Sequence, residues 1–342
     1  MTSQMLDEAR QSPALVEAAL REDRDLYDAV GRTLRTRPPE FVATVARGSS
    51  DHAASYAASL FGILAGRATA TLPPSLITRY GARLGLARAL VLGISQSGAS
   101  PDLVQVMAAV RIAGATRIAI VNAAGSPLAA ESDWVLPQRA GPEYAVAATK
   151  SFVLTMVCVV RLVAAWMEDA ALTEALARLP DRLAAALACD WSAGLPVLAA
   201  TTRGAYVVGR GPGMAVAQEA ALKLKETSNM HAEAVSAAEI QHGPRAVADA
   251  GFPVLAFGLD DPGGADTRAL AAEFSKFGVP VCLATHSSTG TGVHLPLPQP
   301  LHPLLDPIVA VLAFYPFAEA LARLRGLDPD RPRGLHKVTE TI

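Results

Sequence analysis

A short run of hydroxyl and amide side chains follows a buried-looking apolar segment. The run is Ser95-Gln96-Ser97-Gly98-Ala99-Ser100, and Pro101 directly after it opens a segment of helical period. Serine is a favoured cap and proline a favoured first residue of a helix, so we expect a helix to begin here. Free backbone N–H groups at the positive end of the helix dipole would then meet three hydroxyls. This combination suits a phosphate dianion, although capping and turn formation alone use the same residue types.

Two further loops supply polar groups of the same kind. Gly48-Ser49-Ser50 follows an earlier apolar run, and residues 141–150 lead into the apolar segment that starts at Phe152. Each loop alone is ordinary turn chemistry. Ligands of open α/β sheets bind beyond the carboxyl ends of the strands, so we expect these loops to converge on one anion.

Better-known motifs for nucleotides and for hydrolysis are excluded. The sequence contains no GxxxxGK[ST], and the stretch from Gly209 to Met214 lacks the third glycine of GxGxxG. The hydrolase motif GxSxG also fails, because Ser97 stands where its second glycine is required. The loops are therefore not a nucleotide-hydrolysing P-loop or a hydrolase elbow, and a dinucleotide site is only weakly indicated.

A second group of chemically capable residues lies in the other half of the chain. Residues 218–228 predict a helix that carries Glu219, Lys223 and Glu226 on neighbouring turns. For an isolated helix, a solvated face with (i, i+4) ion pairs is the simpler interpretation. His242 follows shortly and precedes Gly-Pro, at an enforced helix end. A carboxylate and a histidine near a sugar phosphate are what aldose–ketose proton transfer requires.

A repeat defines the elements that must position these loops. Val45-Ala46-Arg47-Gly48 matches Val208-Gly209-Arg210-Gly211 at an offset of 163, and two later apolar runs align at the same offset. Those runs are residues 89–93 with 252–256 and residues 118–121 with 281–284. We interpret the chain as a tandem duplication.

Within the first copy, apolar runs alternate with segments of helical period. The pattern predicts strands at 40–46, 88–94 and 117–122, and helices at 50–64 and 101–114. Continuous apolar strands indicate burial on both faces, as in a parallel sheet covered by helices. The prediction is an α/β protein with two tandem doubly wound, flavodoxin-like domains. We expect a helical arm at 1–36, domains at 37–180 and 195–326 joined near 179–194, and a tail at 327–342.

Composition narrows the class of protein. The 342 residues are 51% apolar and 18% charged with a net charge of −2, so no basic surface for nucleic acid is indicated. The three cysteines and seven histidines have no zinc-site spacing, and we expect neither metal nor cofactor. Charged residues interrupt the first apolar run, and residues 152–166 carry Arg161 and are short for a membrane span. We therefore expect a soluble cytoplasmic protein without a signal peptide or membrane segment.

These stretches together resemble the sugar isomerase (SIS) domain family, in particular the isomerase half of glucosamine-6-phosphate synthase and the stand-alone deaminases of isomerase type. The resemblance runs almost end to end. It is carried by Ser95 to Gly98, by Glu143 with residues 148–152, by residues 219–226 and by His231 to Ala234. His242-Gly243-Pro244 and residues 331–337 continue it.

The resemblance implies a role for each matching residue. The phosphate would be bound by Ser49, Ser50, Ser95, Gln96, Ser97 and Ser100, with Val146 and Ala148 also in the substrate site. Ala148 stands where the synthase has a serine, so one contact to a sugar hydroxyl is lost or made by backbone. Glu226 would move the proton between C1 and C2. His242, supplied by the second subunit of a homodimer, would open the sugar ring. Lys337 would close over the substrate, although composition alone favours a solvated tail.

The synthase takes nitrogen from glutamine with a cysteine near the start of its chain, whereas the first cysteine here is Cys158. The remaining chemistry is deamination of glucosamine 6-phosphate to fructose 6-phosphate and ammonia. A fructosamine-6-phosphate deglycase and a ketose–aldose isomerase are the nearest alternatives. A sugar-phosphate sensor is a further alternative, but it calls for a DNA-binding module that the short, acidic N-terminal arm does not supply.

Overall fold

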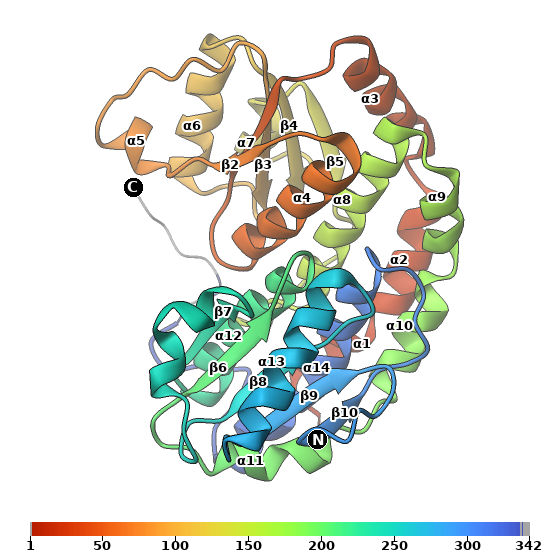
Figure 1. Ribbon diagram of the computed structural model, residues 1–342. Coiled ribbons are helices and arrows are strands. Elements are labelled where there is room, and N and C mark those ends of the chain that lie inside the picture. Colours follow the sequence, from red (N-terminus) through yellow and green to blue (C-terminus); the bar gives the residue numbers. More distant parts are fainter. Residues whose placement is uncertain (1, 336, 338–342) are drawn as a thin grey trace. The chain divides into compact units, whose positions relative to one another are not determined.

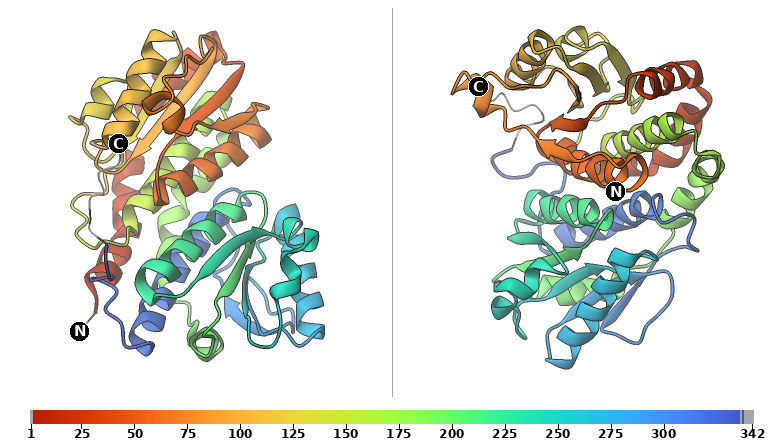
Figure 2. Two further views of the ribbon diagram at one scale, coloured as in Figure 1. Left: turned by 90° about the vertical axis from the view of Figure 1, so that its left-hand side faces the viewer. Right: turned by 45° about the horizontal axis from the view of Figure 1, so that its top comes forward.

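The computed structural model describes residues 2–335 and residue 337, and these fold into two compact units. One unit comprises residues 15–143 and 151–177. The other comprises the described residues up to 14, residues 144–150 and residues 178–337. Each unit contains one five-stranded parallel sheet, with helices on both faces (Figures 1 and 2).

The sheet of the first unit has the strand order β2-β1-β3-β4-β5. All its pairs are parallel, with Val42 opposite Leu90 and Leu92 opposite Ile118. The strands are β1 (Phe41–Val45), β2 (Thr69–Thr71), β3 (Ala89–Ser95), β4 (Thr116–Val121) and β5 (Trp134–Pro137). The helices are α3 (Arg24–Thr36), α4 (Ser49–Ala65), α5 (Ser75–Thr78), α6 (Pro101–Ile112), α7 (Pro127–Ala130), α8 (Lys150–Met167) and α9 (Ala170–Ala177), with α2 (Ser12–Arg21) entering from the other unit.

The sheet of the second unit has the order β7-β6-β8-β9-β10, again parallel throughout. Its strands are β6 (Ala205–Gly209), β7 (Ala232–Ser236), β8 (Val254–Phe257), β9 (Val281–Thr285) and β10 (Val293–Pro296). Its helices are α1 (Gln4–Arg10), α10 (Leu179–Leu187), α11 (Leu195–Ala199), α12 (Gly213–Ser228), α13 (Pro262–Lys276) and α14 (Asp306–Leu324), with 3-10 turns η1 (Ser192–Gly194), η2 (Glu239–His242) and η3 (Pro244–Val247).

Both sheets therefore read 2-1-3-4-5 in the order in which their strands occur, which is the flavodoxin-like arrangement. This confirms the predicted fold class. The strands aligned by the repeat, β1 with β6, β3 with β8 and β4 with β9, occupy equivalent places. The connection at 179–194 is largely helical, formed by α10 and η1.

The core of each unit lies between the sheet and its helices. In the first unit, buried residues of α6 such as Val106 and Met107 pack against Val91 and Val121. In the second unit, Leu270 and Phe274 of α13 are part of the equivalent layer. Every residue of β3 and β9 is buried, as the continuous apolar runs predicted.

Among the described residues, two helices are apolar and long enough to cross a membrane by length and composition alone. They are α8, with 18 residues, and α14, with 19. Contrary to the expectation from sequence, length does not exclude a membrane span for residues 152–166, because the helix that contains them extends from Lys150 to Met167. Burial gives the relevant evidence: 89% of the apolar window of α8 and 78% of that of α14 lie inside the protein, as in core helices of soluble proteins.

Candidate active site

Two helix N-termini lie at the carboxyl edge of the first sheet. β1 is followed by Gly48 and by α4, which begins at Ser49, and β3 is followed by the Ser95–Ser100 loop and α6. Because β1 and β3 are neighbouring parallel strands, both N-termini emerge at the same edge. Ser49 and Ser50 are therefore on the same edge as the predicted phosphate loop. Two positive helix ends at one edge favour an anion.

Hydrogen bonds between residues close in sequence fix the shape of the Ser95–Ser100 loop. The Ser95 hydroxyl accepts a hydrogen bond from the backbone N–H of Gly98 at 3.0 Å, and the Ser97 hydroxyl accepts one from Ala99 at 3.3 Å. Ser100 is the N-cap of α6, followed by a proline as predicted, but its side chain makes no capping hydrogen bond. Gln96, Ser97 and Ser100 are half-buried, which leaves their polar groups within reach of a ligand.

Gly98 is the residue on which this conformation depends. Its φ of +62° lies in the left-handed region, where a side chain is strained. A Cβ atom at this position would lie 2.1 Å from Oγ of Ser126 and 2.5 Å from its Cβ. The backbone of the loop thus packs directly on Ser126, and only glycine fits.

An ion pair beside these loops involves two residues that were not predicted from the sequence. The Arg47 guanidinium donates from Nε and Nη2 to Oδ2 of Asp102, at 3.1 and 2.9 Å. Asp102 is buried in the first turn of α6, whereas the Arg47 side chain is 53% exposed next to Gly48. Arg210, its counterpart in the repeat, pairs with Asp266 at 3.1 Å. The repeated Arg-Gly was a signal for the arginine but not for its acidic partner.

In the second unit, α12 carries a buried network of charges. Lys223 Nζ donates to Oε2 of Glu226 at 2.5 Å and lies 3.3 Å from Oε1 of Glu219. The side chains of Lys223 and Glu219 are fully buried, and that of Glu226 is 18% exposed. The solvated-face interpretation of this helix is therefore wrong for Lys223 and Glu219.

The protonation state of Lys223 follows from its partners. Burial by itself would lower the pKa of the Lys223 ammonium. The charges of Glu219 and Glu226, and the hydrogen bonds to both, outweigh burial and raise the pKa above its ordinary value. Lys223 is a permanent cation that fixes the direction of the Glu226 carboxylate.

Glu226 lines a cavity of about 480 Å³ between α12 and the C-terminal segment. Lys225 and Asn229 line it from the helix side, and Asp328, Arg331 and Arg333 are among its residues from the tail. The volume is in the range of ligand pockets for small molecules. A partly exposed carboxylate held by a buried ammonium is thus presented to a cavity large enough for a sugar.

Lys337, the predicted closing residue, lies beside the 144–150 segment of the same unit. Its Nζ donates to the carbonyl oxygen of Ala145 at 2.6 Å. Val146 and Ala148, the predicted substrate residues of this segment, are half-buried. At the base of the segment, the N–H and Oγ of Ser151 donate to the carboxylate of Glu143 at 3.1 and 2.6 Å.

His242 is the candidate that does not join this group. It ends the 3-10 turn η2, and the next residue, Gly243, has a φ of +123°. The histidine is exposed and is not among the described residues that line the Glu226 cavity.

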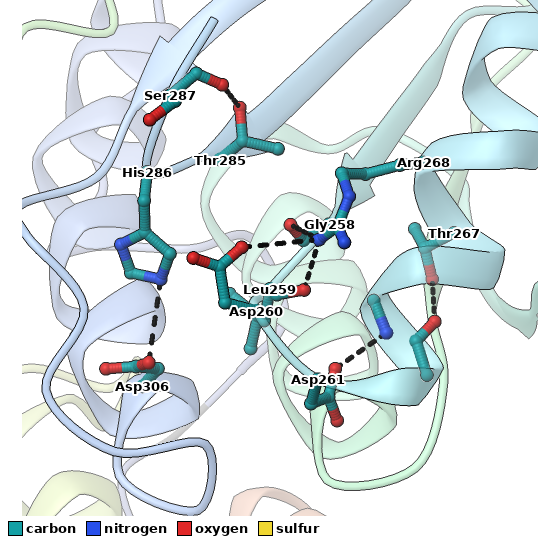
Figure 3. A network of polar contacts seen from close by, with 12 residues as sticks. Gly258, Leu259, Asp260, Asp261, Thr267, Arg268, Thr285, His286, Ser287 and Asp306 are labelled. Carbon is teal, nitrogen blue, oxygen red and sulfur yellow. Dashed lines mark hydrogen bonds and ion pairs between the residues drawn. The ribbon is translucent and has the colours of Figure 1, made fainter. Parts of the chain in front are cut away.

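The equivalent edge of the second sheet is built differently. Figure 3 shows that Asp260 and Asp261 occupy the loop that corresponds to Ser97 and Gly98. The Asp261 carboxylate accepts the N–H of Gly264 at 2.6 Å, so the N-terminus of α13 already holds an anion. Arg268 lies 3.5 Å from Asp260. Two carboxylates at this edge disfavour a phosphate, in contrast to the hydroxyl-rich loop of the first unit.

His286 directly follows β9 and Asp306 begins α14, and their buried side chains face each other (Figure 3). Nδ1 of His286 is 2.5 Å from the carbonyl oxygen of Pro298, which can only accept, so this nitrogen carries a proton. Nε2 then faces Oδ2 of Asp306 at 3.6 Å. Burial raises the pKa of Asp306, against the opposing influence of the Leu301 N–H, His286 and the His302 N–H.

Among the described residues, no group of three or more histidine, cysteine, aspartate or glutamate side chains is arranged to bind a metal ion.

Comparison with known proteins gives consistent results. The family model described as SIS domain matches residues 40–165 and 200–294. Glutamine–fructose-6-phosphate aminotransferase [isomerizing] of Thermococcus kodakarensis is 33% identical over 351 residues, covering 97% of this chain and 57% of that protein. The chain spans about half the length of the curated relatives it matches.

Two solved structures illustrate the likeness of fold. A protein of Silicibacter pomeroyi DSS-3 assigned as a phosphosugar isomerase is 40% identical, with a TM-score of 0.90 over 96% of this chain and 100% of that one. Glucosamine-6-phosphate deaminase of Thermotoga maritima has a TM-score of 0.76 at 19% identity, over 99% and 100% of the two chains. The latter likeness concerns the fold alone.

Proposed function

The chain belongs to the SIS domain family, and from that premise we propose that it is a phosphosugar-converting enzyme that deaminates glucosamine 6-phosphate. The relatives at about one-third identity are named for an isomerising reaction that uses fructose 6-phosphate, and this chain matches about half of their length. Deamination uses only the ring-opening and proton-transfer steps, for which this chain offers His242 and Glu226 as candidates. The observation that carries the proposal is Glu226, held by Lys223 at 2.5 Å and presented to a cavity.

In the proposed reaction, the phosphate is bound by the Ser95–Ser100 loop with Ser49 and Ser50. His242, contributed by a second copy of the chain, assists ring opening. Glu226 removes the proton from C2 of the open-chain aldose and delivers it to C1. The product is a fructose imine, and water adds to its C2 and expels ammonia, leaving the ketone of fructose 6-phosphate. No redox agent is consumed, since C1 is reduced as C2 is oxidised.

Lys223 and Lys337 support this chemistry in different ways. The buried Lys223 ammonium orients the Glu226 carboxylate and prevents it from turning away from the cavity. Lys337, which donates to the Ala145 carbonyl, brings the tail to the segment that carries Val146 and Ala148. We propose that the tail encloses the sugar on this side, excluding water until the imine has formed.

We further propose a cytoplasmic homodimer. Cys158, Cys189 and Cys282 are all free thiols, as in a reducing compartment. The exposed His242 is suited to act in the site of another copy, because it does not line the cavity of its own Glu226.

The test is to incubate the purified protein with glucosamine 6-phosphate and measure ammonia and fructose 6-phosphate. The proposal predicts both products in equal amounts. Release of an amino acid from a glycated amino-acid 6-phosphate, without ammonia from the amino sugar, would assign a deglycase instead. Interconversion of an unaminated ketose and aldose phosphate alone would assign an isomerase.

A further inference from the structure

The N-terminal helix α1 makes contacts to residues far away in the chain, which its own sequence did not predict. Its Glu8 side chain is buried, with 1% of its surface exposed. Oε1 accepts the backbone N–H of Tyr144 at 2.6 Å, and Oε2 accepts that of Ala145 at 3.2 Å. The amide of Gln4 donates to Oε1 at 3.0 Å. A buried carboxylate whose oxygens both accept backbone N–H groups fixes that backbone firmly.

The other polar group of Ala145 completes a second connection. Its carbonyl oxygen is the acceptor for Lys337 Nζ at 2.6 Å. Glu8 therefore holds Ala145, whose carbonyl oxygen accepts the hydrogen bond from Lys337. Val146 and Ala148 follow directly in the same segment. A shift of the Tyr144–Ala145 backbone would move the acceptor and the substrate segment together.

The tail is also attached to the start of the same helix. Asp330 accepts the backbone N–H groups of Gln4 and Met5, at 2.7 and 2.8 Å. Two of the orphan donors at the N-terminus of α1 are satisfied in this way, by a carboxylate that the helix dipole favours. Asp330 is seven residues before Lys337, so α1 binds the tail at one point and the acceptor of its lysine at another.

From these contacts we propose that Glu8 is a positioning residue for Lys337: it holds the Tyr144–Ala145 backbone so that the tail closes with Lys337 at the substrate segment. All the residues concerned belong to the second unit. The kinetic part of the inference rests on the proposed function, whereas the tail contact itself does not. Glu8 touches neither substrate nor reacting atoms and acts through Ala145 and Lys337.

The kinetic test is a double-mutant cycle with Glu8→Gln and Lys337→Met. Glutamine has nearly the shape of glutamate, but its NH₂ faces one of the two backbone donors. We expect kcat to fall about ten- to a hundredfold, the factor for losing a hydrogen bond to a charged group. KM is expected to change little, because the phosphate loop is not involved. In the Lys337→Met background, Glu8→Gln should cause no further loss. The inference would be overturned if the kcat losses of the two single variants multiply in the double variant, or if kcat is unchanged in Glu8→Gln.

The second readout needs no substrate: hydrogen exchange at the Tyr144 and Ala145 amides, and tryptic cleavage between Arg333 and Gly334. Glu8→Gln should speed both, with an unchanged far-UV circular dichroism spectrum. The control is Asp7→Asn, at an exposed neighbouring residue of the same helix, which should change neither rate. If Glu8→Gln does not fold, Asp330→Asn provides the alternative, with faster cleavage expected at the same bond.

The two readouts separate the failure of this inference from the failure of the proposed function. A protein inactive on amino sugar phosphates whose tail is nevertheless released by Glu8→Gln would reject the function and keep the tail contact. An active deaminase whose tail cleavage is unaffected by Glu8→Gln and Asp330→Asn would keep the function and reject the role of Glu8.

Discussion

Replacement of Gly98 by alanine tests whether the shape of the phosphate loop depends on this glycine. The left-handed conformation, with φ of +62°, costs an alanine about 1–2 kcal/mol. The new methyl group would also lie 2.1 Å from Oγ of Ser126, and relief of such overpacking costs about 1–3 kcal/mol. We therefore expect Gly98→Ala to lower the free energy of unfolding by about 2–5 kcal/mol in total.

Two controls divide this cost into its parts. Gly66 ends α4 with φ of +60°, and a Cβ there would meet nothing within 4 Å. Gly66→Ala should thus show only the backbone strain of about 1–2 kcal/mol. Ser126→Gly removes both of the closest atoms. The destabilisation caused by Gly98→Ala in that background should therefore also fall to the cost of backbone strain alone.

The assays are urea unfolding and the KM for glucosamine 6-phosphate. Gly98→Ala should raise KM at least tenfold, because a displaced loop cannot hold the phosphate, while Gly66→Ala should leave it unchanged. Equal destabilisation by Gly98→Ala and Gly66→Ala would refute the packing argument. An unchanged KM in a folded Gly98→Ala variant would refute the assignment of the loop to the phosphate.

The remaining predictions concern buried charges of the second unit. Lys223→Met leaves Glu219 and Glu226 without their shared cation and should lower the free energy of unfolding in urea by about 3–5 kcal/mol. The double variant Lys223→Met with Glu219→Gln should recover part of this loss. No recovery would argue against the charge network. Burial raises the pKa of Asp306, so the folded state favours the protonated form of this side chain. The contribution of Asp306 to the free energy of unfolding must therefore fall as the pH rises from 3.8, the ordinary pKa of aspartate, through the pKa in the folded state. Between pH 4 and pH 7, the free energy of unfolding of the wild type should therefore fall relative to that of Asp306→Asn. The expected fall is about 1.4 kcal/mol for each unit by which the pKa is raised. A constant or rising difference would contradict this assignment.

The sequence predicted those features that depend on local pattern. β1, β3 and β4 were found because both faces of a central parallel strand are buried, which gives a continuous apolar run. The start of α6 was found because Ser100 and Pro101 are strong local signals. β7 was missed because it is an edge strand whose exposed Glu233 interrupts the apolar pattern.

The contacts between residues far apart in the chain were out of reach of such patterns. Arg47 and Asp102 are 55 residues apart, and Glu8 and Ala145 are 137 apart. Nothing in their immediate surroundings indicates the partner. Burial of Lys223 was also unpredictable from its helix alone, because the same Glu-Lys spacing is typical of solvated helices. Tertiary packing, not the spacing of the charged residues, decides whether such a Glu-Lys pair is buried or solvated.

The central claim is that Glu226 transfers the C2 proton of an amino sugar phosphate. It is tested most directly by proton NMR of glucosamine 6-phosphate with the enzyme in D₂O. For the wild type, the account predicts loss of the C2 proton signal together with formation of fructose 6-phosphate. Glu226→Gln should abolish that loss, while Lys225→Gln, the matched neighbour in the same cavity, should retain it. Continued loss of the C2 proton in folded Glu226→Gln would contradict the account.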